Sequence, residues 1–501
     1  MIKKLFPLLI IFTFVTILYY PALSTYFSQD DFFHFKVSQT DGSLNGFLNL
    51  FGFHSFSERG IAFYRPVSRE LLFNLYYPVF NLNPLPFRIF SFLIHFLNIY
   101  LLSVFVQKLF KKEALSFFVS FFFGISAANV ATLYYLAGGI QTLLATTFTL
   151  SSLLFFQKYL ETNLTKFKIF SFLSFILGIS SHEQAIIIPL LTLGLIFVYK
   201  PLKDIKQYTL NLFLYFITIL IILYLEASKI GFSVNEQQYQ AVFNIKTVFN
   251  SLFWYINWAL GLPETLVDFV APGFRLNPTL LRYWRDYYIF IFPAYFLSIA
   301  MLAFATTYLL IKKRRLFTNK IFLFNLAWFP IGLLPVILLP LHKSTHYLTI
   351  SLPAFWTVIG YIIFSFYHAL KEKRVLLSKI YLATAILSLL ILSTTSAILG
   401  SNNYWAANRG LLAKQLINNI KNTYPNLPKG ATIYIKNDPN YPFVAKEWGG
   451  SSKQAALILN NDDALRLIYK DPTLKVYYED REKPPKNLPQ DKIYTITAKI
   501  F

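Results

Sequence analysis

The chain has 501 residues, of which 55% are hydrophobic and only 14% charged. Soluble proteins carry about 25% charged residues, so much of this surface is expected to face lipid. The net charge of +22 is compatible with nucleic-acid binding, but most Lys and Arg residues form short clusters between apolar runs. Clusters of that kind set membrane topology, so we expect no nucleic-acid partner. Cysteine is absent, which excludes disulfides, thiolate metal sites and a cysteine nucleophile.

Apolar runs recur at roughly twenty residues, the length that a helix needs to cross a hydrocarbon layer of roughly 30 Å. They lack the alternation of barrel strands, so the sequence predicts an all-α polytopic bundle of about eleven transmembrane helices in a lipid bilayer. The first run starts like a signal peptide but has no clear cleavage site, so we expect an uncleaved span. The other runs are residues 87–107, 114–134, 138–158, 168–182, 184–199, 208–226, 287–311, 320–341, 347–368 and 376–398.

The runs 168–182 and 184–199 are short, and the polar turn Ser180–Glu183 separates them. They form either two spans or a re-entrant pair. With two spans, every loop on the predicted cytoplasmic side is basic, as at Lys312–Arg315, whereas the outer turns Leu136–Gly139 and Ser180–Glu183 have no Lys or Arg. We therefore predict a plasma-membrane protein with a cytoplasmic N-terminus and, because the number of spans is odd, an extracytoplasmic C-terminus.

Two outer loops are long: loop one, residues 28–86, and a second at 227–286. Their stretches SRELLFNLYYPVF and SLFWYINWALGL are expected either to lie along the membrane interface or to pack against the spans. We predict a transmembrane domain at 1–399 and a small extracytoplasmic α/β domain at 400–501. In the latter the pattern predicts a helix at 404–424, a strand at 431–437, a helix near 452–459 and strands near 474–478 and 493–501.

The strongest local signal is the acidic pair Asp30 and Asp31, directly after the first span. Adjacent carboxylates beside a membrane are costly unless they are solvated, paired or bound to a cation. The pair could hold a divalent metal ion such as Mg or Mn, or accept a proton from an attacking hydroxyl group. A solvated acidic turn or a helix cap is the alternative.

Further along loop one comes Tyr64-Arg65-Pro66. Arg65 could bind phosphate through two parallel hydrogen bonds, or pair with a nearby glutamate on the surface. Pro66 suits the first turn of a helix. His95 lies within the run 87–107, where a polar side chain usually faces the bundle interior, as a packing histidine or as a catalytic one.

Two more polar clusters interrupt the apolar runs. His182 and Glu183 lie at the turn between 168–182 and 184–199, where Glu183 is either a functional carboxylate or part of a helix cap. Lys343 and His346 lie in the turn before 347–368 and could form a cationic rim for phosphate, unless the turn is simply solvated.

These clusters map to the same predicted outer face. Carboxylates opposite a cationic rim, at the boundary of the lipid, suit a substrate with a lipid tail and a phosphate head. The carboxylates would serve the acceptor, and the cations would stabilise the departing lipid phosphate. The residues concerned are Asp30, Asp31, Arg65, Glu183, Lys343 and His346.

The order of these motifs resembles the polyprenol-phosphate-sugar-dependent glycosyltransferases of the GT-C superfamily, especially the membrane part of TPR-containing transmembrane O-mannosyltransferases and their bacterial relatives. The resemblance covers residues 1–370 and rests on the acidic pair, the YRP segment and the run FRIFSFLIHFLN. Leu136–Leu144 looks like the small-residue turn into their fourth span. Ser181–Ala185 resembles their Lys-Glu segment, with His182 in place of Lys. His346-Tyr347-Leu348 resembles an Arg-Tyr-Leu segment, with His in place of Arg.

Carried over residue by residue, the resemblance implies that Asp30 or Asp31 is the catalytic base or a metal ligand. It places Arg65 and Glu183 near the donor site, and Lys343 and His346 toward the lipid phosphate. The other residues expected to bind substrate are Tyr64, His95, His182 and Tyr347. A neutral histidine at 346 would pair with phosphate less strongly than an arginine does, and Lys343 could compensate. TPR repeats are absent from the sequence, so binding through them is not implied.

The resemblance implies transfer of a sugar from a polyprenyl-phosphate donor to an acceptor glycan, lipid or protein outside the cytoplasm. A transporter or flippase is the main rival, but it would be expected to carry ionisable residues within its spans and repeated halves. An O-antigen ligase or polymerase would use diphosphate donors and would be expected to rely on outer-loop arginines. A scaffold that displays the C-terminal domain is the third alternative.

Overall fold

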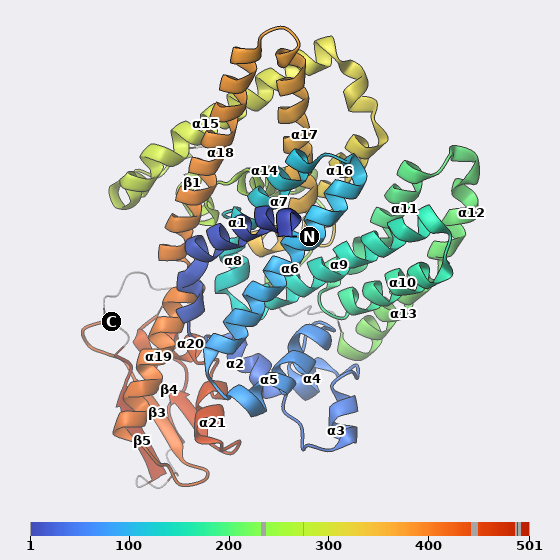
Figure 1. The fold of residues 1–501 in the computed structure, drawn as a ribbon. Coiled ribbons are helices and arrows are strands. Elements are labelled where there is room, and N and C mark those ends of the chain that lie inside the picture. Colours follow the sequence, from blue (N-terminus) through green and yellow to red (C-terminus); the bar gives the residue numbers. More distant parts are fainter. Residues whose placement is uncertain are drawn as a thin grey trace.

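The computed structural model describes residues 2–231, 237–273, 275–441, 449–485, 488 and 492–499. It is a helical bundle with a small sheet at one end (Figure 1). Within these ranges, seven helical segments are long and apolar enough to cross a membrane, so the prediction of a helical multi-pass membrane protein is confirmed at this level. The segments contain α1 (Ile2–Tyr19), α6 (Pro84–Phe110), α9 (Leu136–Thr162), α13 (Phe213–Leu225), α15 (Thr279–Lys312), α17 (Leu352–Lys371) and α18 (Val375–Asn403).

Shorter helices account for the rest of the predicted apolar runs. They are α7 (Glu113–Ile125), α10 (Thr165–Ile179), the 3-10 helix η3 (Glu183–Ile187) continued by α11 (Ile188–Tyr199), and α16 (Lys320–Leu333). At a rise of about 1.5 Å per residue, none of them alone crosses a layer of roughly 30 Å. For residues 168–199, two spans and a re-entrant pair therefore both remain as alternative predictions.

Three predicted runs have different bounds in the structure. The run 114–134 is divided, because α7 ends at Ile125 and α8 (Asn129–Tyr134) follows a turn. The run 320–341 ends as an α-helix at Leu333, two residues before Pro335, which has no N–H to donate. The run 347–368 becomes helical at Leu352, with a proline in the first turn, where its missing N–H costs nothing.

Helix α9 is the centre of the bundle. Of its apolar window, 83% is buried inside the protein, against 11% for the peripheral segment Ile205–Ile230. Helices α6, α10 and α11 pack directly against α9. The residues at the start of α9 are therefore fixed by neighbours on several sides.

Loop one contains four short α-helices and a single π turn. They are α2 (Asp30–Val37), α3 (Leu44–Asn49), α4 (Phe56–Arg59), η2 (Val67–Leu71) and α5 (Leu72–Phe80). The second long connection contains α14 (Ile245–Leu260), η8 (Glu264–Phe269) and the two-residue strands β1 (Val270–Ala271) and β2 (Arg275–Leu276). Both stretches predicted as amphipathic are thus helical.

The C-terminal segment, residues 404–499, begins with α19 (Trp405–Thr423) and forms a three-stranded parallel sheet of order β4-β3-β5. Four further elements lie where the sequence predicts them: β3 (Thr432–Lys436), α20 (Ser451–Ile458), β4 (Lys475–Tyr478) and β5 (Ile493–Thr497). The helix α21 (Asp463–Tyr469) was not predicted. The final two residues of the predicted last strand lie outside the described residues.

Loop one and the C-terminal segment share one hydrophobic core, separate from the core of the bundle. Phe32, Phe35 and Phe73 of loop one belong to the same buried cluster as Leu416 and Ile433 of the C-terminal segment. Figure 1 shows the two parts side by side at one end of the molecule, with the turn between α17 and α18 at the other. The C-terminal segment therefore forms one wall at this end of the bundle.

Candidate functional site

A cleft of about 690 Å³ lies where loop one, the start of α9, the turn before α17 and the C-terminal segment meet. Glu183, at its edge, pairs with one of the lining residues. The structure thus brings together residues that are up to 431 positions apart in the chain. The predicted site residues that line this cleft are Asp30, Arg65, His182, Lys343, His346 and Tyr347.

Asp30 is the first residue of α2 and is exposed in the cleft. The hydroxyl group of Tyr135, just before α9, donates a hydrogen bond to its Oδ2. The ring of Tyr135 packs on Trp405 of α19 at 5.0 Å between centroids, and the guanidinium of Arg409 lies 5.0 Å from the Trp405 ring centre. A carboxylate open to the cleft can accept a proton from a group that enters it, and the phenol and the cation nearby favour its ionised form.

Asp31, the second residue of the acidic pair, has different surroundings from Asp30. Its side chain is buried, and its two carboxylate oxygens accept hydrogen bonds from the backbone N–H groups of Ser28 at 3.0 Å and Ala137 at 2.8 Å. Burial raises the pKa of Asp31 to about 6, although the Arg88 charge and these N–H groups act in the opposite direction. The two predicted carboxylates therefore have different surroundings, and Asp31 does not line the cleft.

The turn from α8 into α9 places Tyr135 and Ala137 at this point. A side chain at Gly139 would lie 1.8 Å from the carbonyl oxygen of Thr132, so only glycine permits the two helices to approach this closely. The predicted small-residue turn therefore has a steric role. It brings the Tyr135 hydroxyl within reach of Asp30.

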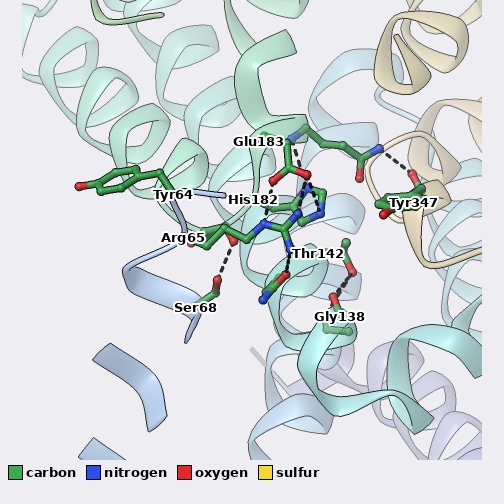
Figure 2. A network of polar contacts seen from close by, with 12 residues as sticks. Tyr64, Arg65, Ser68, Gly138, Thr142, His182, Glu183 and Tyr347 are labelled. Carbon is green, nitrogen blue, oxygen red and sulfur yellow. Dashed lines mark hydrogen bonds and ion pairs between the residues drawn. The ribbon is translucent and has the colours of Figure 1, made fainter. Parts of the chain in front are cut away.

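A second wall of the cleft contains an ion-pair network (Figure 2). Arg65 donates two hydrogen bonds to Glu183, from Nε to Oε2 at 2.8 Å and from Nη2 to Oε1 at 2.6 Å. It also donates to the side-chain carbonyl of Gln141 in α9. Burial acts to raise the pKa of Glu183, but the charges of Arg65 and His182 outweigh it and hold this pKa at about 2. Both partners are therefore charged at neutral pH.

Backbone and side-chain contacts fasten this wall to the bundle. The Val67 N–H donates to the carbonyl of Ser180 at 3.0 Å, and the Ser68 hydroxyl donates to the carbonyl of Ser181 at 2.6 Å. Gln184 then donates from Nε2 to the carbonyl of Tyr347 at 2.9 Å. Hydrogen bonds thus join the segment after Arg65, the turn before Glu183 and the turn before α17.

The third side of the cleft is formed by Lys343, His342 and His346. Lys343 donates from Nζ to Oδ1 of Asn250 in α14 at 3.1 Å. Burial lowers the pKa of His342 to about 4, with the Arg65 charge adding to the effect, and burial lowers the pKa of His346 well below its ordinary value. Both histidines are therefore neutral at physiological pH, and the positive charge on this side belongs to Lys343.

Besides Asp31, two predicted site residues lie away from the cleft. Tyr64 donates its hydroxyl to the carbonyl of Phe51 and stacks on Phe53 at 3.9 Å between ring centres, and Figure 2 shows it pointing away from the Arg65–Glu183 pair. His95 is fully buried in the bundle, with Nε2 3.2 Å from the carbonyl oxygen of Gly124. Of the two roles weighed for His95, the structure fits packing.

Sequence reasoning missed several cleft residues. Gln141 stood in the quoted glycine segment, and a buried amide in an apolar run is a signal that could have identified it. His34 follows the acidic pair directly, and its Nε2 lies 3.4 Å from Gln141 Nε2. Trp405 and Arg409 gave no local signal, because they stand in an ordinary helical pattern 375 or more positions after Asp30.

The carboxylates do not fit a shared metal site. Both oxygens of Asp31 are already used by backbone N–H groups, which leaves Asp30 without its neighbour as a second ligand. The described part of the chain contains no group of three or more His, Asp or Glu residues placed to hold a metal ion. We therefore derive no chemical step through a metal, and the metal dependence inferred from the sequence stays a prediction.

Comparison of the chain with protein-family models, with curated proteins and with solved structures found no match. The function is therefore argued from the residues and their geometry.

Proposed function

We propose that the protein is an integral membrane glycosyltransferase that transfers a sugar from a polyprenyl-phosphate donor to an acceptor hydroxyl group on the extracytoplasmic face. The observation that carries this proposal is the cleft itself. Its lining includes an exposed carboxylate, Asp30, and the cations Arg65 and Lys343, at one end of a bundle that contains membrane-length helices. A donor with an apolar tail and an anionic head suits that combination.

The chemistry needs one base and one set of cations. Asp30 takes the proton from the acceptor hydroxyl as its oxygen attacks the anomeric carbon, and the bond from that carbon to the phosphate oxygen breaks. The polyprenyl phosphate leaves with the bonding electrons, and attack from the opposite side inverts the anomeric carbon. The leaving phosphate gains a negative charge, which Lys343 and Arg65 are placed to stabilise.

The proposal includes the finer topology. Eleven spans, a cytoplasmic N-terminus and an extracytoplasmic C-terminus place loop one and the C-terminal segment on the outer side, together with the cleft. The basic clusters at Lys312–Arg315 and Lys371–Arg374 support this orientation, since cytoplasmic loops are enriched in Lys and Arg. A cysteine introduced at Ser43 in loop one should react with a membrane-impermeant maleimide in intact cells, whereas one at Thr318 should not.

The direct test uses purified protein in lipid vesicles with radiolabelled polyprenyl-phosphate sugars and a panel of acceptor glycans, lipids and peptides. We expect labelled product with at least one donor, and transfer slower by about 10²–10⁴-fold with Asp30→Asn. Transfer that persists undiminished in Asp30→Asn would show that the assigned base is wrong.

Two further assays separate the rivals. A flippase would move a fluorescent polyprenyl phosphate between leaflets without acceptor, and this movement would not depend on Asp30. A ligase or polymerase would use a polyprenyl-diphosphate glycan in preference to the monophosphate. Either result, without transfer from the monophosphate, would overturn the proposal.

A further inference from the structure

Two buried charged residues, Asp31 and Arg88, hold the same two backbone segments together. The first segment is residues 25–31, which lead from the first helix into α2, and the second is residues 133–137, which lead from α8 into α9. Asp31 accepts an N–H from each: Ser28 at 3.0 Å and Ala137 at 2.8 Å.

Arg88, near the start of α6, bridges the same segments through their carbonyl groups. Its guanidinium donates to Thr25 at 3.2 Å and Tyr26 at 3.4 Å on the first, and to Leu133 at 3.2 Å and Tyr134 at 2.9 Å on the second. Arg88 is 1% exposed, and the position of each of the four carbonyls is therefore tied to a rigid helix.

These segments carry the two groups that meet in the cleft. Asp30 directly precedes Asp31 in the first segment, and Tyr135 directly follows Tyr134 in the second. The Tyr135 hydroxyl donates a hydrogen bond to Asp30. The backbone directly before Asp30 is also constrained. Gln29 has a φ of 50°, a left-handed conformation that costs energy in a residue with a side chain and persists only where its surroundings impose it. The Gln29 N–H donates to the carbonyl of Ile458 in the C-terminal segment at 2.9 Å.

Resting on the proposed function, we infer that Asp31 and Arg88 are positioning residues that together fix the geometry of Asp30 and Tyr135. Asp31 then has no direct part in proton transfer, and the acidic pair consists of one base and one structural anchor. Both anchors are buried charges, which are stable only when their hydrogen bonds are made. Neutral or shorter replacements leave backbone N–H or carbonyl groups without partners and let the two segments separate.

The inference predicts a graded series of variants. Asp31→Asn keeps one acceptor oxygen, and Asp31→Ala keeps none. Because a misplacement of about 1 Å can cost about 100-fold in rate, we expect kcat to fall about 10-fold in Asp31→Asn and about 100-fold in Asp31→Ala. The donor KM should stay within about twofold, since the cations that hold the phosphate are untouched. Arg88→Lys should resemble Asp31→Asn, because one ammonium cannot reach four carbonyls.

A catalytic Asp31 would behave differently. Asn and Ala would then be equally inactive, both as inactive as Asp30→Asn, and that result would overturn the inference. Full activity of Asp31→Ala would overturn it as well. Asp41→Asn, an exposed carboxylate elsewhere in loop one, is the matched control and should retain wild-type kcat.

Hydrogen–deuterium exchange gives a readout that does not depend on transfer activity or on full stability of a variant. In Arg88→Lys we expect faster exchange confined to peptides covering 25–31 and 133–137. Exchange unchanged there, or faster throughout the bundle, would contradict the positioning role. If the wild type transfers no sugar from any donor, the proposed function fails, but this exchange pattern still tests whether the anchors exist.

Discussion

The two walls of the cleft differ in the pairing and exposure of their charged side chains. On the wall of Arg65 and Glu183, opposite charges meet through two hydrogen bonds, and Gln141 completes the network. On the wall of Asp30, the carboxylate is exposed, the Tyr135 hydroxyl donates a hydrogen bond to it, and its charge interacts with that of Arg409. A satisfied pair holds its geometry, whereas an exposed carboxylate can exchange a proton. The difference suggests a fixed wall for binding and a reactive wall for chemistry.

The largest expected effect tests the reactive wall. Asp30→Asn removes the base while it keeps the size of the side chain. We expect kcat to fall about 10²–10⁴-fold, the usual contribution of general base catalysis, with the donor KM little changed. Steady-state transfer assays with Asp41→Asn as the control check this. A rise in the donor KM at unchanged kcat would show that Asp30 contributes to binding and not to proton transfer. The distinction between the two walls would then be wrong.

The next effect tests the fixed wall. Glu183→Gln leaves Arg65 buried without its counter-charge, and we expect the free energy of unfolding to fall by about 2 kcal/mol, less than for a fully buried pair because water reaches Glu183 in part. The double variant Arg65→Gln with Glu183→Gln should recover part of that loss. Thermal unfolding in detergent measures both. Additive losses would mean that the two residues do not stabilise each other.

A smaller effect is expected at the rim. Lys343→Gln removes the charge that faces the leaving phosphate, and we expect the donor KM to rise about 10-fold, equivalent to about 1.4 kcal/mol. Lys246→Gln, an exposed lysine at the start of α14, is the matched control. Equal effects of the two variants would indicate a general attraction to anionic lipid instead of a phosphate site.

The smallest effect expected concerns pH. The lowered pKa of His342, about 4, and that of His346, well below its ordinary value, keep both rings neutral between pH 6 and 8. A phosphodiester donor does not titrate in that range, so its affinity should be flat there and should rise only as the pH falls below about 5, when His342 gains a proton. A marked rise in affinity between pH 8 and 6 would show that a rim histidine is charged near neutrality. Equilibrium binding of a labelled donor, measured as a function of pH, distinguishes a flat affinity from a rising one.

The sequence by itself determined the membrane character and the secondary structure. Run length and the scarcity of charge predict the long helices, and the helix and strand patterns after residue 404 match α19 and β3. Both depend on local patterns of side chains, which any short window of the chain displays. The polar clusters also predicted some of the residues that line one cleft, namely Asp30, Arg65, His182, Lys343, His346 and Tyr347.

Tertiary structure alone decided the roles within that cleft. Asp30 and Asp31 are indistinguishable as neighbours in the sequence, and they differ only because the backbone of Ala137, more than a hundred positions away, binds one of them. Likewise Trp405 and Arg409 reach Tyr135 only because the C-terminal segment shares a core with loop one. Contacts between distant segments set which charge is buried and which is exposed, and the sequence shows no pattern for such contacts.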